Sequence, residues 1–240
     1  MSNTQLAAFG SIPVSEAALP STEKKAKPQG KFLPRVQFVS TGSSKLVTEK
    51  KVGVGHWALV DGDVTTDLGE SIDVIVLARV DKGVDFSGDE TVVAFKSQNE
   101  EDNAEYARIE AEVIADGYDS GCMYGPVFLL FLCDTEQFVE CFLNNTSGRN
   151  EADNIDLFLP ISVEAAKAND CEPRAPRLAT LGTKEVTSKR GKKSYTYNVP
   201  TTNEGPKSIK LDNPPEPTEV IERCNKFVDQ TKIEKESRNR

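Results

Sequence analysis

The chain has 240 residues, a formal net charge of -9 and a composition that is 38% apolar and 28% charged, which is enough for one ordinary globular core. Its longest apolar run, Val127 to Cys133, is far shorter than the roughly 20 residues of a membrane-spanning helix. The first 20 residues contain no Lys or Arg and no long apolar block, so we expect no secretory signal, no membrane partner and a cytoplasmic protein.

The charge is unevenly distributed along the chain. Residues 61–160 carry -18, whereas residues 1–60 carry +5 and residues 161–240 carry +4. Because electrostatic fields in physiological salt decay over about 8 Å, an acidic total does not exclude a polyanionic partner.

Three segments are predicted. Residues 1–31 are expected to be a flexible leader, because a polar, basic stretch interrupted by prolines buries too little apolar surface to offset the entropy of ordering. Residues 32–204 are predicted to form a single β-rich domain. Residues 205–240 are predicted to be a proline-rich connector and a C-terminal helix over 218–231, whose apolar residues fall on one stripe.

Strands dominate the predicted domain. Alternating or continuous apolar patterns predict strands over 35–40, 52–60, 71–80 and 91–96. Two pairs of apolar runs predict hairpins, one over 125–143 and one over 176–200 with Arg190 and Gly191 at its tip.

Helices are expected between these strands. A helix is predicted over 99–117, and short helices over 147–160 and 162–170 with Ser147 and Ser162 as N-caps. The order of elements predicts an α+β chain that is mainly β. The expected architecture is an OB-like barrel, closed or partly open, with an inserted helix, a late basic hairpin and a C-terminal amphipathic helix. A generic α+β sandwich is the alternative.

No constellation typical of an enzyme is found. The only histidine, His56, stands beside the only tryptophan, Trp57, and no nucleophile elbow, P-loop or dinucleotide-binding glycine motif occurs. The five cysteines lack paired spacing, so they are expected to be reduced thiols and not zinc ligands. We therefore expect a protein that is not an enzyme and that needs no cofactor or metal.

Two loops hold unusual residues. Residues 61–73 contain five carboxylates but do not fit the calcium-loop pattern, so a solvated turn is favoured over a cation site. Residues 117–126, "GYDSGCMYGP", are glycine-rich and are read as a tight connection from helix to strand, with a ligand loop as the alternative.

The stretch "SKRGKKSYTYNV" (188–199) is the strongest candidate site. Its cations would contact phosphates, and its two tyrosines, two residues apart on one side of a strand, would stack on unpaired bases. The alternative is a solvated turn whose tyrosines pack on the core. The candidate nucleic-acid-binding residues are Lys189, Arg190, Lys192, Lys193, Tyr195 and Tyr197, with Trp57 and Tyr124 as additional stacking candidates.

Parts of the chain resemble proteins of bacteriophage replication modules. The resemblance lies in "MSNTQLAAFGSIP", "IDVIVLARVDKGVD", "SGCMYGPVFLLF" and "KKSYTYNVP". Phage single-stranded-DNA-binding proteins of this kind have OB-like barrels, so the resemblance implies that fold, a role in replication or recombination, and the cytoplasm of an infected bacterial cell. Such proteins often end in an acidic tail that recruits partners. This chain ends in "KIEKESRNR", so the helix 218–231 either takes over that role or packs on the barrel.

The prediction is therefore non-enzymatic binding of single-stranded DNA or RNA by a basic, aromatic surface. Two alternatives come from other classes. One is a virion or assembly protein whose terminal arms order on neighbouring subunits, as a homo-oligomer. The other is an acidic decoy that binds a host protein through residues 61–160.

Overall fold

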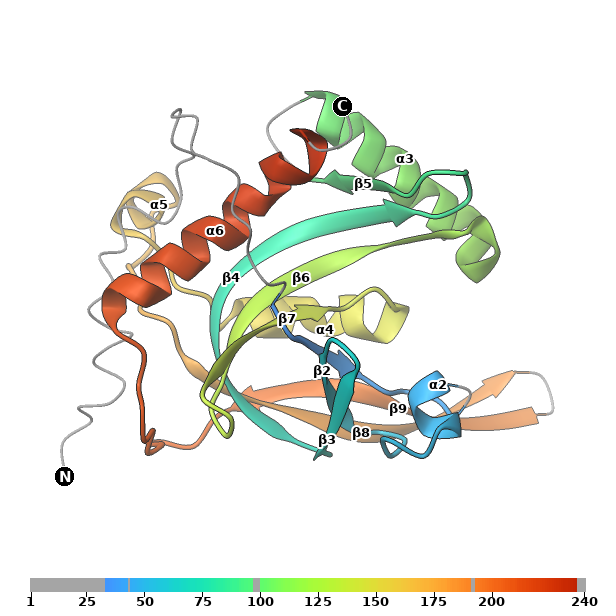
Figure 1. Cartoon of the computed structure of the whole chain (residues 1–240), viewed down its shortest axis with the longest axis horizontal. Coiled ribbons are helices and arrows are strands. Elements are labelled where there is room, and N and C mark those ends of the chain that lie inside the picture. The colour runs from blue at the N-terminus through green and yellow to red at the C-terminus, as the bar shows by residue number, and fades with distance from the viewer. Residues whose placement is uncertain (1–32, 43, 97–99, 191–192, 237–240) are drawn as a thin grey trace.

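The structure is a computed structural model that describes residues 33–42, 44–96, 100–190 and 193–236. Over these residues the chain is α+β and mainly β, as predicted, with a strongly curled, open half-barrel sheet of nine strands and a few helices (Figure 1). None of the described helices combines the length and the apolar character needed to cross a membrane. The leader predicted over 1–31 lies outside the described residues.

The sheet contains strands from every part of the described chain. Its members are β1 (Arg35–Phe38), β2 (Trp57–Asp61), β3 (Val64–Gly69), β4 (Ile72–Asp85), β5 (Val92–Phe95), β6 (Cys122–Leu132), β7 (Gln137–Phe142), β8 (Leu178–Arg190) and β9 (Lys193–Glu204). They lie in the order β3-β2-β1-β7-β6-β4-β8-β9, with β5 paired to β4. Neighbouring strands are antiparallel except β1 and β7, which run parallel.

The long strand β4 organises the sheet. One of its edges pairs with β6, and the other pairs with β8 at Ile72–Ile75 and with β5 at Lys82–Asp85. The register with β6 shifts between Val76 and Ala78, which is a bulge, and a bulge bends and twists a strand. Figure 1 shows the resulting curl of β4 and β6.

The helices cover the two faces of this sheet. They are α2 (Lys45–Thr48), α3 (Glu100–Asp116), the 3-10 helix η1 (Gly117–Ser120), α4 (Thr146–Asp156), α5 (Val163–Ala168) and α6 (Pro217–Glu236). On one face, Ala152 and Ile155 of α4 pack against Phe128, Leu130 and other fully buried residues of the largest core cluster. The predicted helix over 99–117 is confirmed as α3, and the predicted N-cap Ser162 accepts a hydrogen bond from the backbone N–H of Ala165 at 2.9 Å.

The C-terminal helix α6 covers the opposite face. Its Val220, Cys224 and Phe227 are buried against Phe131 and Phe138 of the second core cluster. Figure 1 shows α6 along the outer side of the bend in β4. The apolar stripe that was a candidate for a protein partner is therefore covered by the sheet itself.

Several predicted boundaries were wrong. The acidic stretch 61–73 is not a plain solvated turn: Gly62, with φ +59°, reverses the chain and Val64–Gly69 returns as β3 beside β2. β3 itself contains only one carboxylate, Asp67, and the acidic residues on either side of the strand hid it. The helix predicted to begin at Ser147 is capped by Asn145, whose side chain accepts from the backbone N–H of Gly148 at 2.6 Å.

Candidate nucleic-acid interface

The β8–β9 hairpin continues beyond its root as a two-stranded ribbon. β8 pairs with β4 only through Leu178–Leu181, whereas it pairs with β9 in unbroken register from Ala179↔Glu204 to Arg190↔Lys193. Beyond Leu181 its nine residues extend over about 30 Å, at ~3.4 Å per residue. Figure 1 shows the ribbon extending away from the body of the sheet.

Both tyrosines of the candidate site lie on one exposed side of this ribbon. Tyr195 is 48% exposed and Tyr197 is 36% exposed, and they stand opposite Ser188 and Val186 of β8. Neither ring is a core residue. Residues directly opposite in an antiparallel pair share a face, and this surface is called the tyrosine face below; its members are Lys184, Val186, Ser188, Tyr195 and Tyr197.

Positive charge also lies on this ribbon. Residues 183–200 contain five basic side chains and one acidic one. Lys184 and Lys189 are exposed on β8, and Arg190 pairs in register with Lys193 at the last described positions of the ribbon. Lys192 lies outside the described residues, and so do the side chains of Arg190 and Lys193. The predicted cations therefore belong to the ribbon that carries the tyrosines.

Trp57 does not belong to this surface. Its ring has no exposed area, and its indole N–H donates to the backbone carbonyl of Gly182 at 3.4 Å. Phe38 packs beside it, with ring centroids 5.1 Å apart. The prediction that Trp57 stacks a base is corrected: the tryptophan is a core residue that anchors the root of the ribbon.

Tyr124 is also removed from the ribbon and is already covered. The guanidinium of Arg149 lies 4.3 Å from its ring centroid, and Tyr106 meets it edge-on at 6.3 Å. A face that holds a cation is not free to stack on a base. The contact joins residues 25 positions apart in the chain, so no local sequence pattern indicates it.

The single histidine supports the loop next to the ribbon. His56 Nδ1 lies 2.9 and 3.0 Å from the two carboxylate oxygens of Asp67. Burial alone would raise the pKa of Asp67, but the backbone N–H groups of Gly69 and Gly53, together with His56, outweigh burial and lower it. The preceding Gly55 has φ +82°, and a Cβ there would come within 2.9 Å of the Asn198 side chain. The His56–Asp67 pair therefore belongs to a structural loop, and this loop packs against Asn198 of β9.

One cluster has the donor types of a metal site. The ligand atoms of Asp85, Glu112 and Cys122 lie within 4.8 Å of one another. However, the Arg108 guanidinium donates to Asp85 at 2.6 Å and to Glu112 at 2.5 Å, so a positive charge already sits among the carboxylates. Burial, followed by the two carboxylates, raises the pKa of Cys122 to about 12, which keeps the thiol protonated at neutral pH. The cluster is therefore a structural ion network that ties α3 to β4 and β6.

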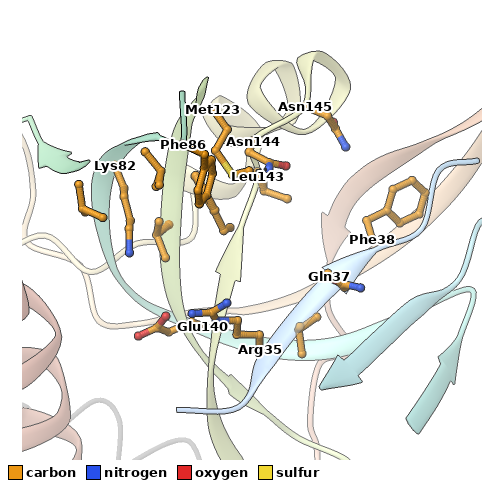
Figure 2. A pocket seen from close by; sticks show the side chains of 15 residues that line it. Arg35, Gln37, Phe38, Lys82, Phe86, Met123, Glu140, Leu143, Asn144 and Asn145 are labelled. Carbon is orange, nitrogen blue, oxygen red and sulfur yellow. Dashed lines mark hydrogen bonds between the residues drawn. The ribbon is translucent and has the colours of Figure 1, made fainter. Parts of the chain in front are cut away.

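One groove was missed by sequence reasoning. It has a volume of about 490 Å³ and is lined by residues of β1, β4, β5, β6, β7 and the Asn144–Asn145 turn. Figure 2 shows Arg35 and Glu140 at one end and Asn144 and Asn145 at the other. None of its lining residues is Ser, Thr, Cys or His, and its charged residues are Arg35, Lys82 and Glu140. Its lining comes from five strands, and no local motif marks such a surface.

Comparison of the chain with protein-family models, with curated proteins and with solved structures finds no match. The resemblance to phage replication proteins accordingly stays a prediction from the sequence.

Proposed function

We propose that the protein binds single-stranded nucleic acid through the tyrosine face and the cations at the tip of the β8–β9 ribbon. The observation that carries the proposal is the exposure of Tyr195 and Tyr197, at 48% and 36%, on one side of a ribbon that leaves the sheet. Exposed aromatic rings beside cations are what sequence-tolerant single-strand binders use.

The spacing of the tyrosines suits an extended strand. Residues two apart in a β-strand are separated by about 6.8 Å, which leaves room for one base on each ring. The bases of a duplex are paired and stacked, so a preference for single strands is expected. Lysine and arginine side chains at the ribbon would pair with phosphates and release counterions, which makes the affinity fall as salt rises.

The wider setting is part of the same proposal. A curled, open, mainly-β sheet could bind nucleic acid on its surface as an OB-fold does. The sheet differs from the five-stranded OB-fold in having nine strands and a parallel β1–β7 pair. The sequence resemblance supports a role in phage replication or recombination in the cytoplasm of an infected bacterial cell.

A titration of labelled single-stranded oligonucleotide by fluorescence anisotropy tests the proposal. We expect binding to oligothymidylate that weakens between low and physiological salt, and weaker binding to a duplex of equal length. Stacking contributes about 1–3 kcal/mol per base. Changing Tyr195 and Tyr197 together to Ala should therefore weaken single-strand binding by at least about tenfold.

Phe86→Ala is the matched control, because Phe86 is 50% exposed and lies in the groove instead of on the ribbon. It should leave the affinity unchanged. Equal affinity of the tyrosine double variant and the Phe86 variant would remove the tyrosine face from the proposal. Absence of salt-dependent single-strand binding would overturn the proposal as a whole.

A further inference from the structure

β9 is an open edge of the sheet. The strand order ends at β9, and within the described residues its twelve residues pair only with β8. An exposed edge of this length is a template for another strand, and proteins usually shorten or block such edges. We propose that a second copy of the chain pairs with this edge, β9 to β9, in antiparallel orientation about a two-fold axis.

The hydrogen-bond pattern says which backbone groups are available. The N–H of Gly205 donates to the carbonyl of Leu178 at 3.2 Å, directly beyond the Ala179↔Glu204 pair. In an antiparallel pair the bonded positions alternate. Along β9 the odd-numbered residues therefore bond to β8, and Ser194, Thr196 and Asn198 direct their N–H and C=O groups away from β8.

Pro200 sets one end of this available edge. It shares the outward parity of Asn198, and a proline at such a position forfeits no bond within the hairpin. It also offers no N–H to another strand. The usable edge is thus confined to Lys193–Val199.

One register uses this edge completely. With the two-fold axis through Thr196, Thr196 pairs with its own copy and Ser194 pairs with Asn198 of the second copy. Each of the three pairs exchanges two N–H···O bonds, about six in all. An axis through Tyr195 or Tyr197 would form only two such pairs within Lys193–Val199, about four bonds.

The side chains fit the same register. Tyr195 then stands opposite Tyr197 of the second copy, in a pair whose Cα atoms are about 4.5 Å apart. Aromatic pairs across strands stabilise a sheet. Lys193 faces Val199 instead of another lysine, and the two copies of Lys193 are separated by about 20 Å along the ribbon. That distance exceeds the ~8 Å over which charges act in physiological salt.

Charge also favours antiparallel pairing of the ribbons. The basic tip of one ribbon runs toward the root of the other, where α4 contacts β9. The contact lies near Thr202–Glu204, since Asn154 of α4 and these residues line one hollow. α4 carries Glu151 and Asp153 on this part of the helix, so opposite charges approach each other.

The interface is small, and the dimer should accordingly be weak. Stable complexes typically bury about 1,600 Å² in total, and the pairing of seven residues buries less. A dissociation constant in the micromolar range is expected, so dimers should form as the protein is concentrated. The pairing does not require nucleic acid.

Disulfide trapping tests the register directly. In a Cys171→Ser background, which removes the exposed cysteine, Thr196→Cys would place two thiols on Cα atoms about 5.5 Å apart, within disulfide reach. Thr187→Cys is the matched control: Thr187 is exposed and directly opposite Thr196 in the same ribbon. Its distance to its own copy would span three strand spacings, about 14 Å, which is beyond disulfide reach.

We expect covalent dimers of the Thr196→Cys protein on a non-reducing gel, and none or few of the Thr187→Cys protein at equal concentration. Equal trapping of both variants, or of neither, overturns the proposal. Trp57 fluorescence is the check that each variant is folded.

Sedimentation without nucleic acid provides the second measurement. The wild-type chain should shift from monomer to dimer with concentration, as should Thr196→Val. Thr196→Lys should stay monomeric, because it sets two ammonium groups directly opposite. A wild type that stays monomeric throughout the micromolar range contradicts the proposed dimer and leaves the nucleic-acid proposal standing. A dimer that fails to bind single strands contradicts only the proposed function.

Discussion

The Asp85→Asn variant provides the sharpest test of the energetics. Asp85 is 7% exposed at the end of β4 and accepts three hydrogen bonds. Ser87 donates through its backbone N–H at 2.8 Å and its hydroxyl at 2.6 Å, and Arg108 donates from Nη2 at 2.6 Å. An asparagine keeps one oxygen for Ser87 but turns an NH₂ group toward the guanidinium of Arg108.

The magnitude follows from the bond that is lost. A hydrogen bond to a charged group contributes about 1.5–3 kcal/mol. Arg108 is 39% exposed and keeps Glu105 and Glu112 as partners, so solvent screening places the loss near the lower limit, about 1.5 kcal/mol at pH 7.

The loss should depend on pH with a defined sign. The hydrogen bonds from the Ser87 hydroxyl and N–H, and then from Arg108, hold the pKa of Asp85 well below its ordinary range. A carboxyl with a lowered folded pKa contributes stability above its unfolded pKa, about 3.9, and loses that contribution as the pH falls toward the folded value. Asparagine does not titrate, so at pH 3 the difference between wild type and variant should be smaller by roughly 1 kcal/mol.

Urea unfolding followed by Trp57 fluorescence measures this difference, because the only tryptophan is fully buried. The exposed Asp63→Asn is the control and should leave the free energy of unfolding within about 0.5 kcal/mol of wild type. A difference for Asp85→Asn that is absent at pH 7, or that does not change between pH 7 and pH 3, would refute the reasoning.

Three further outcomes are expected. Gly125→Ala should destabilise by about 3 kcal/mol or more, because its Cβ would lie 2.3 Å from the Leu143 carbonyl, whereas Gly62→Ala, which meets no atom, should lose only about 1 kcal/mol in thermal unfolding. Phe227→Ala should lower the free energy of urea unfolding by about 3–5 kcal/mol, since the ring is 2% exposed between α6 and the sheet. A thiol reagent should label one cysteine, Cys171, rapidly in the native protein and all five after unfolding, because the other four are buried with pKa values near 12.

The sequence predicted those elements whose pattern is local. The continuous apolar runs of β4 and β6, the amphipathic pattern of α3 and the stripe of α6 each identify their element. The parallel pairing of Arg35 with Glu140 left no local trace, because register over such a separation is decided by the packing of both faces. This pairing is why the open half-barrel, and the groove that it helps to line, could not be derived.

The candidate site was predictable to the same extent. Strand periodicity placed Tyr195 and Tyr197 on one side, but their exposure depends on where β4 stops pairing with β8. The sequence could not separate them from Trp57, because an aromatic residue on a strand has the same pattern whether it faces solvent or core. Trp57 is buried through contacts with distant residues such as Gly182, whose carbonyl accepts its indole N–H, and these contacts are seen only in the folded structure.

The pairing of β4 has a consequence for how the chain folds. Ile72 pairs with Leu181, more than a hundred residues later in the sequence. Synthesis proceeds at about 5–20 residues per second. The edge of β4 that pairs with β8 therefore stays unpaired for several seconds after β4 has been synthesised. Such distant contacts slow folding, since the loop entropy is lost before the contacts form. The nascent chain thus exposes an apolar strand edge of β4 until β8 emerges.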